Sequence, residues 1–500
     1  MPDFTRMKIE ILSSQFSSDV VLVKRVTGHE KISRLFEFRV QVVVMDRELT
    51  LTPEQLRGES VSLVIHEEGE VHRQIHGMVA CAEESFAVSV DHEQFELLIV
   101  PHVWQLTTIM LQEVYIDQSV PDLIRRKFAR ANLGKEGTDF EFQLHGNYPK
   151  IPFIIQYQES DFDFISRLAE DVGISYYFVH SDQSEEVATD KIVFCDFLEA
   201  FPGIASTTFE RSGQKVGLYE LGWLANLVPY KYAVRDYNYE SPQVDLTGVT
   251  EAKGNGGVMG ATIEYGNHFE SPAEATSLVE VRAEEAACHQ SIYKGRSDLL
   301  TFSAGRCFSI EDYPKVSDAL LLVELHHEFI QTVQSHDGHD DDRFYLNSFE
   351  AIPRDRNYRP PRVTPVPKMP GVVTGFIVSE STTCRNTLPS TAAADIDDQG
   401  RYLVEFHLDT PGDSSAAVPS KRIRMAQPCS GASYGIHMPL RPGTEVVVAF
   451  LNGDVRRPVI MGAVHNATSP SPVTALDATK TRIQSQTGLM IEFCDAPDGN

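Results

Sequence analysis

The residue types best suited to binding a metal ion gather in one stretch of the sequence: His326, His327, Glu328, His336, His339 and Asp340 to Asp342. Imidazole nitrogen and carboxylate oxygen are the ligands that zinc and related ions take in proteins. However, the segment from Leu320 to Phe329 alternates like a β-strand, and neighbouring residues on a strand point to opposite faces. His326 and His327 therefore cannot share one ion. We interpret the polar segment that follows (SHDGHDDD) as a solvated loop, in which His336 and His339 are only weak metal candidates.

Nucleophilic and phosphate-binding chemistry find no support in the sequence patterns. We expect no serine in a G-x-S-x-G nucleophile elbow, and none of the seven cysteines lies in a recognisable catalytic signature. The glycine-containing segments EAKGNGGVMG and DIDDQGR do not follow a strand and open a helix, as a phosphate-binding loop does. We predict that the protein is not an enzyme and has no catalytic residue, no cofactor and no metal.

The overall charge restricts the partners. The 500 residues include 71 acidic and 44 basic side chains, which gives a formal net charge of -27. Contact with nucleic acid phosphates requires a basic surface, and an anionic membrane surface attracts basic segments. We therefore expect neither nucleic acid binding nor docking on a membrane surface.

Cysteine usage and the N-terminus indicate the compartment. The cysteines are widely scattered without a C-x-x-C pair, as is typical of free thiols in a reducing cytoplasm. The start of the chain (MPDFTRMKIE) has no charged segment followed by an apolar one, so no signal peptide is visible. No apolar run reaches the roughly 18 residues of a membrane span. We expect a cytoplasmic protein whose export would use a route other than general secretion.

The elements that must position any site are mainly β-strands. Period-two alternation predicts strands at residues 36–44, 61–66, 95–100, 320–329 and 344–352. Helical periodicity with a capping serine at the start predicts three helices, near 119–133, 160–172 and 271–293. The pattern is that of a mainly β protein with a few helices.

A change of composition separates two parts of the chain. The segment 356–371 (RNYRPPRVTPVPKMPG) is rich in proline and reads as an extended linker. Short strands without a strong helix follow over residues 372–465, which predicts a small closed barrel such as an OB fold. The region before the linker, residues 1–365, would form the larger part of the protein.

The barrel is expected to close with the hairpin GTEVVVAFLNGDVRRPVIMG. The apolar run Val446–Leu451 is typical of a strand buried on both faces. Asn452-Gly453 tolerates the positive φ of a tight turn, and Pro458 opens the return strand. Arg456 and Arg457 are expected to be exposed charges of the turn.

The tail, residues 466–500, has no core of its own. Arg482 to Phe493 alternates like a single strand, yet no partner strand is visible in the chain. A lone strand can neither pair its backbone nor bury its apolar face by itself. Threefold association of identical chains would supply both partners.

The order of several motifs resembles the VgrG family, the trimeric tip spikes of bacterial type VI secretion systems, which are related to hub and spike proteins of contractile phage tails. The resemblance rests on YQESDFDFISRLAEDVGISYYF, FSAGRCFSI, LVELHHEF, GTEVVVAFLNGDVRRPVIMG and TRIQSQTGLMIEF. It implies two barrel-like hub domains within residues 1–365, an OB fold at 372–465, and a three-chain β-helix needle whose first strand lies in 466–500. The chain stops where the family's needle would begin, so we expect either a truncated chain or a member with almost no needle.

The resemblance also implies a structural function. Three copies would form a hub that sits on the Hcp tube, with a PAAR-type tip protein and effectors at the needle end. The spike would puncture a target membrane and would be injected from the cytoplasm without a signal peptide.

Three alternatives remain open at this stage. The first is a tail hub of a contractile phage or phage-derived particle. The second is a spike fused to a cell-wall hydrolase, although the segment from Val464 to Arg482 is far shorter than a domain. The third is a sugar-binding barrel, although both tryptophans, Trp104 and Trp223, lie outside the predicted barrel.

Overall fold

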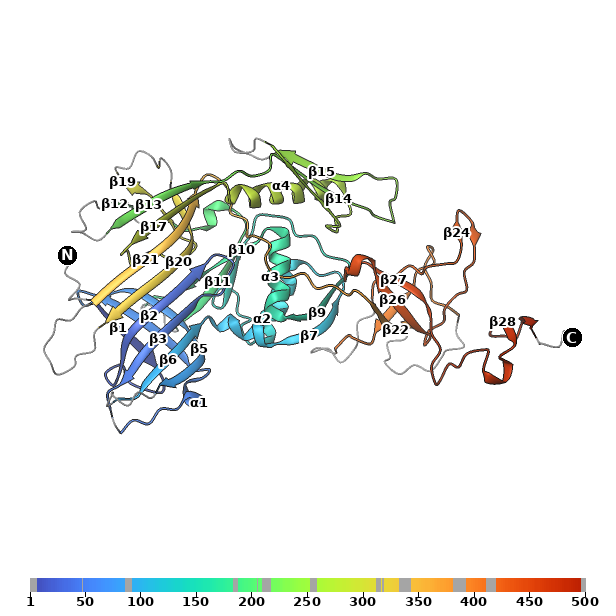
Figure 1. Ribbon diagram of the computed structural model, residues 1–500, viewed down its shortest axis with the longest axis horizontal. Coiled ribbons are helices and arrows are strands. Elements are labelled where there is room, and N and C mark those ends of the chain that lie inside the picture. Colours follow the sequence, from blue (N-terminus) through green and yellow to red (C-terminus); the bar gives the residue numbers. More distant parts are fainter. Residues whose placement is uncertain are drawn as a thin grey trace. The chain divides into compact units, whose positions relative to one another are not determined.

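The structure is a computed structural model that describes residues 7–46, 48–85, 92–182, 188–204, 206–208, 217–251, 259–311, 316, 319–331, 343–380, 393–410 and 420–495. The chain forms two compact units, shown in Figure 1. Unit 1 comprises Met1–Ile109, Val120–Tyr148 and Asp161–Pro365. Unit 2 comprises Met110–Ser119, Pro149–Ser160 and Val366–Asn500.

An eleven-stranded antiparallel sheet dominates unit 1 (Figure 1). Its strands lie in the order β1 (Met7–Ser13), β4 (Ser60–Glu67), β5 (Glu70–Ser85), β6 (Gln94–Val100), β3 (Glu37–Val44), β2 (Val21–Lys31), β20 (Leu320–Gln331), β21 (Arg343–Pro353), β17 (Ser291–Ser297) and β13 (Leu218–Ala225). The eleventh strand, β18 (Cys307–Phe308), pairs with β20 beside this path. Because β2 pairs with β20, strands from both ends of unit 1 share one sheet.

Two hydrophobic cores lie on this sheet. The first takes alternate residues of β3, such as Phe38 and Val40, which are fully buried. The second is built around β20 and β21 and includes Leu325 and Phe349. The period-two pattern thus turns one face inward along each strand. One continuous sheet thus carries both cores, and the division of this region into two barrel-like domains stays a prediction.

Among the described residues, longer helices occupy the three predicted regions: α2 (Val120–Arg130), α3 (Asp161–Val172) and α4 (Pro272–Cys288). A short helix, α1 (Pro53–Leu56), is added by a capping box at Thr52. Ser271 caps α4 by accepting the backbone N–H of Glu274, as expected. The prediction that this helix runs to residue 293 is wrong, because Ser291–Ser297 pairs as β17 with strands on both sides.

Smaller elements complete unit 1. One three-stranded sheet has the order β10 (Ser175–His180), β11 (Asp190–Cys195), β8 (Phe140–Gln143), and another has the order β15 (Leu246–Glu251), β14 (Lys231–Asp236), β16 (Ala261–Tyr265). A further pair is β12 (Thr207–Thr208) with β19 (Ile310–Glu311), and two 3-10 helices are η2 (His102–Thr108) and η3 (Leu198–Ala200). α4 packs on the β15–β14–β16 sheet, where Ala275 and Val279 meet Tyr232 and Val234.

Unit 2 is built on a four-stranded antiparallel sheet with the order β23 (Leu403–Phe406), β22 (Val372–Val378), β26 (Glu445–Phe450) and β27 (Pro458–Ala463). A second pair, β7 (Met110–Tyr115) with β9 (Ile154–Ser160), comes from much earlier in the chain. Val114 and Ile155 of this pair share one core with Ile377, Val404 and Val448. The sequence prediction assigns both early segments to residues 1–365, whereas the compact unit includes them here.

The predicted closing hairpin of unit 2 is present as β26 and β27. Asn452 and Gly453 have φ of 56° and 74°, in the left-handed region that this dipeptide tolerates. The connection is longer than a two-residue turn, since it includes the 3-10 segment η4 (Leu451–Gly453) and reaches Arg457. Two expectations are wrong: β26 buries only alternate residues, and Arg456 and Arg457 are half-buried rather than exposed.

The tail also differs from the expectation of one lone strand. It folds back as a hairpin of β28 (Lys480–Gln484) and β29 (Met490–Cys494), after the 3-10 segment η5 (Ala475–Asp477). Gly488, at φ 88°, provides the turn. A second small hairpin in unit 2 pairs β24 (Ser430–Gly431) with β25 (Tyr434–Gly435). Residues 480–484 of the tail are therefore paired with residues 490–494 of the same chain.

The fold class is the predicted one, mainly β with a few helices. Within the described residues, the helices are all too short or too polar to cross a lipid bilayer.

Candidate functional site

The tail hairpin has one apolar and one charged face. Ile483 lies opposite Ile491, and Thr481 lies opposite Phe493. These side chains share one face because residues alternate along each strand. Ile491 and Phe493 are 58% and 60% exposed. An isolated two-stranded hairpin is marginally stable in water, and an exposed apolar face marks a surface that contacts another protein.

Ion pairs orient the opposite face of this hairpin. Arg482 Nη2 lies 2.7 Å from Glu492 Oε2, and Lys480 Nζ lies 3.2 Å from Glu492 Oε1. Hydrogen bonds from Arg482 and Lys480 lower the pKa of the Glu492 carboxyl below its ordinary value. The hairpin can thus present its apolar face while its charged face stays solvated.

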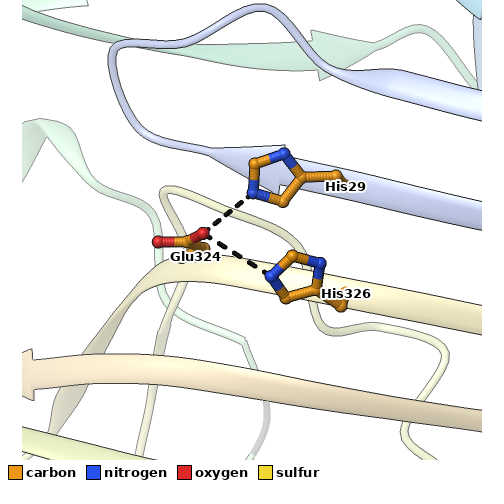
Figure 2. Close-up of side chains that lie close together, drawn as sticks. All are labelled: His29, Glu324 and His326. Atoms are coloured by element: carbon orange, nitrogen blue, oxygen red, sulfur yellow. Dashed lines mark hydrogen bonds and ion pairs between the residues drawn. The ribbon is translucent and has the colours of Figure 1, made fainter.

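A second candidate lies on the solvent side of the large sheet in unit 1. His29 Nε2 is 2.9 Å from Glu324 Oε1, and His326 Nε2 is 3.5 Å from the same oxygen. Figure 2 shows both imidazole rings directed toward this carboxylate from adjacent strands. Among the described residues, these three form the group whose ligand atoms could hold a metal ion.

The reverse side of the same strand pair carries a buried polar network. Arg73 donates hydrogen bonds to Glu30 and to the carbonyl of Phe302. His327 is 2% exposed, and its Nδ1 lies 2.9 Å from Tyr345 Oη. Although burial alone raises the pKa of Glu30, Arg73 and His327 hold it well below the ordinary value. The network is enclosed by the core, which favours a structural role.

A third arrangement has the hydrogen-bond order of a serine hydrolase triad. Ser60 Oγ lies 2.9 Å from His102 Nε2, and His102 Nδ1 lies 2.7 Å from Asp190 Oδ1. Asp190 also accepts the backbone N–H of His102 at 2.6 Å. Burial opposes charge on His102, but its hydrogen bond to Asp190 raises the pKa of the imidazole. We interpret the set as an anchor for the start of η2.

One further catalytic pattern requires a correction. The expectation that the chain lacks G-x-S-x-G is wrong, because Gly431 to Gly435 reads GASYG. A nucleophile elbow places its serine between a strand and a helix. Here Ser433 lies at the tip of the β24–β25 hairpin, and the described residues after it, 436 to 444, contain no helix. The match therefore has the wrong structural context for an elbow.

The residues singled out from sequence have different outcomes. His326 and His327 lie on opposite faces of β20, as the alternation predicts. His336, His339 and the run Asp340 to Asp342 lie outside the described residues. Sequence reasoning missed His29 as a neighbour of His326, because the two are far apart in the chain. The available signal was the i, i+2 spacing of Glu324 and His326, which places both on one face.

Comparisons with known families and proteins agree with this architecture. The model of the phage tail baseplate hub (GPD) family matches residues 29–333. The model of the type VI secretion system/phage-baseplate injector OB domain matches residues 391–465.

Curated relatives extend the match over most of the chain. The type VI secretion system spike protein VgrG1b of Pseudomonas aeruginosa is 26% identical over 492 residues, covering 95% of this chain and 63% of that relative. VgrG1a of the same organism is 28% identical over 483 residues, which cover 94% of this chain and 71% of VgrG1a. The actin cross-linking toxin VgrG1 of Vibrio cholerae is 24% identical over 504 residues, which cover 94% of this chain and 43% of the toxin. The chain thus spans less than two thirds of the length of VgrG1b and of the toxin.

Solved structures show the same fold. The E. coli c3393 protein, described as a component of the type VI secretion system similar to T4 bacteriophage tail proteins gp27 and gp5, has a TM-score of 0.63 and 22% identity, covering 91% of this chain and 100% of that chain. A chain of the lidded Francisella PdpA-VgrG complex has a TM-score of 0.60 and 10% identity, with 98% of this chain and 75% of that chain covered. The chain therefore belongs to the phage tail baseplate hub (GPD) family and, within it, to the VgrG spike proteins.

Proposed function

We propose that three copies of this chain assemble into the hub and the base of the spike of a type VI secretion apparatus. The observation that carries the proposal is the order of the two family matches, a baseplate hub over residues 29–333 and an injector OB domain over 391–465. The exposed apolar face of the tail hairpin supports association, because burying apolar surface is the main favourable term in assembly.

The proposed partners bind at the two ends of such a spike. The hub would contact the Hcp tube, and the other end would carry a PAAR-type tip and effectors. Contraction would drive the preassembled particle from the cytoplasm through a target membrane. The action is mechanical, and its support is the spike proteins among the relatives of this chain.

The proposal includes the absence of enzymatic activity in these residues. The actin cross-linking toxin is matched over 43% of its own length, so this chain corresponds to less than half of that protein.

An esterase assay with a chromogenic ester tests the Ser60–His102–Asp190 set directly. We expect the rate of the buffer alone, unchanged in Ser60→Ala. Turnover that disappears in Ser60→Ala would establish an enzyme instead.

The assembly is tested by light scattering on the purified chain across a concentration series. We expect a particle of three chains, each of 55.9 kDa. The proposed trimer would be contradicted if the chain stayed monomeric at every concentration, and did so also when any native sequence beyond residue 500 was included.

The injection role requires a test in the producing bacterium. Deleting the gene should abolish release of the tube protein into the medium, and the full-length gene should restore it. Because the matching family is named for phage baseplates, a phage-derived particle is the second candidate. Unchanged tube release, together with capsid genes beside this gene, would favour that candidate.

A further inference from the structure

We propose that His29, Glu324 and His326 form a binding site for a divalent transition-metal ion, with Zn²⁺ as the probe of choice. The inference is independent of the proposed assembly, because all three ligands come from unit 1 of a single chain.

The sheet register brings the three side chains together. His29 on β2 is directly opposite His326 on β20, and Glu324 precedes His326 by two residues. Residues two apart on a strand, and residues directly opposite on the neighbouring strand, project from the same face. Both strands lie inside the large sheet with partners on each side, so the ligand positions are held by backbone hydrogen bonds. The sheet therefore fixes the backbone positions from which the three side chains project.

The distances suit a small ion. Zn²⁺ bonds of about 2.0–2.1 Å in tetrahedral geometry place ligand atoms about 3.3 Å apart. Here the two imidazole Nε2 atoms lie 2.9 Å and 3.5 Å from Glu324 Oε1, and all three ligand atoms fall within 4.8 Å of one another. The two carboxylate distances are close to this spacing, so changes of side-chain rotamer, without movement of the backbone, would admit the ion between the three ligand atoms.

The two imidazole rings lie side by side and would have to turn about their side-chain bonds before both in-plane Nε2 lone pairs could point at one ion. The imidazoles of His29 and His326 stack with their centroids 4.5 Å apart and their planes 14° apart. Figure 2 shows that both present Nε2 to the same carboxylate oxygen. A metal would replace the His29–Glu324 hydrogen bond and the longer His326–Glu324 contact with coordination by two neutral imidazoles and one carboxylate, a ligand set that zinc takes in proteins.

Lys31 sets the charge of the site. Its Nζ lies 2.6 Å from Glu324 Oε2, which leaves Oε1 facing the two imidazoles. The ammonium group also repels a cation, so Lys31 limits the metal affinity. Removing its charge should tighten binding.

A hollow beside the cluster would leave room for a further ligand. It has a volume of about 270 Å³ and is lined by Glu324 and His326 together with Lys294, Arg296 and Ser348. Three protein ligands with an open position are typical of zinc sites that keep a water or an exogenous ligand.

The test measures Zn²⁺ binding to the tag-free full chain after removal of metals by a chelator. Isothermal titration calorimetry gives the affinity, and elemental analysis of the dialysed protein counts bound ions. We expect one site per chain. His29→Ala and His326→Ala should each weaken binding by about 100-fold or more, because changes even beyond the direct ligands cost 10–100-fold. Lys31→Met should strengthen it.

Matched variants separate this site from other ligands. His72→Ala removes a half-exposed histidine of the same unit and should leave the affinity unchanged. The double variant His336→Ala/His339→Ala should also bind normally. Zinc held by the exposed thiols of Cys81, Cys429 and Cys494, instead of by the proposed site, would persist in a His29→Ala/His326→Ala variant. Three results would overturn the proposal. They are full zinc binding by His29→Ala/His326→Ala, loss of binding in His336→Ala/His339→Ala, and no binding by the unaltered chain.

Discussion

At the scale of single residues, unit 1 encloses ionisable groups that most cores exclude. Glu30, Arg73 and His327 are buried next to one another. A buried charge is tolerated only when it is paired and hydrogen-bonded. Glu30 satisfies this condition, since one carboxylate oxygen accepts from Arg73 and the other accepts the backbone N–H of Ala304.

The first prediction concerns pH. Burial lowers the pKa of His180 to about 3, and its Nδ1 accepts the backbone N–H of His76. The unfolded chain binds this proton near the ordinary pKa of 6.5, so the stabilisation is complete above that pH and falls as the pH decreases toward 3. Each such histidine lowers the free energy of unfolding by up to about 1.4 kcal/mol for each unit by which the pH falls in this range. Thermal unfolding midpoints measured between pH 7.5 and 4.5 should decline.

A matched variant identifies the group responsible. His180→Gln keeps a hydrogen-bond acceptor but does not titrate. It should lower the midpoint at pH 7.5, because the ring packs against Phe36, and flatten the decline below pH 6.5. An equally steep decline in this variant would show that other groups cause the pH dependence.

The second prediction compares a buried and an exposed ion pair. Arg73→Met leaves the carboxylate of Glu30 buried without its main partner and should cost about 3–5 kcal/mol of unfolding free energy. Arg25→Met breaks the exposed pair with Glu328 on the same sheet and should cost at most about 1 kcal/mol. Denaturant titrations measure both values. Equal losses in the two variants would refute the distinction.

At the scale of elements, central strands decide whether each unit folds. β26 lies between β22 and β27 in unit 2, and its alternate residues Val446, Val448 and Phe450 are buried in one core. The intervening residues are half-buried. The strand therefore tolerates polar substitution on one face only.

The third prediction uses this difference. Val448→Asp puts a carboxylate into the core without a partner, so we expect loss of soluble expression. Val447→Asp, on the half-buried face, should remain soluble with a smaller loss of stability. The fraction of soluble protein and the unfolding midpoint are the measurements. Normal folding of Val448→Asp would refute the assignment of the core.

At the scale of the whole molecule, the tail hairpin connects the single chain to the proposed assembly. Its two strands pair with each other along one edge each, so a partner could use both the outer strand edges and the exposed apolar face. This gives the proposed association a hydrophobic driving force.

The fourth prediction follows from that face. Deleting residues 481–500 should weaken the trimer, and Ile491→Ser with Phe493→Ser should weaken it without removing the hairpin. The control is Thr481→Ser, which keeps the apolar residues. Sedimentation velocity at several concentrations gives the assembly state. An unchanged trimer in both variants would show that unit 1 and the rest of unit 2 suffice for assembly.

Local patterns in the sequence determined the fold class, the helices near 119–133 and 160–172, the Asn452-Gly453 turn and the family resemblance. These features depend on residues that are close in the chain, such as capping serines and alternating apolar positions. Only the tertiary structure decided that β7 and β9 join the core of unit 2, that the tail folds back on itself, and that His29 meets His326. Such contacts depend on strand order and register, which are set by the packing of the whole sheet. A periodic pattern shows which face a side chain occupies, whereas its neighbour on the next strand is determined only when the sheet has formed.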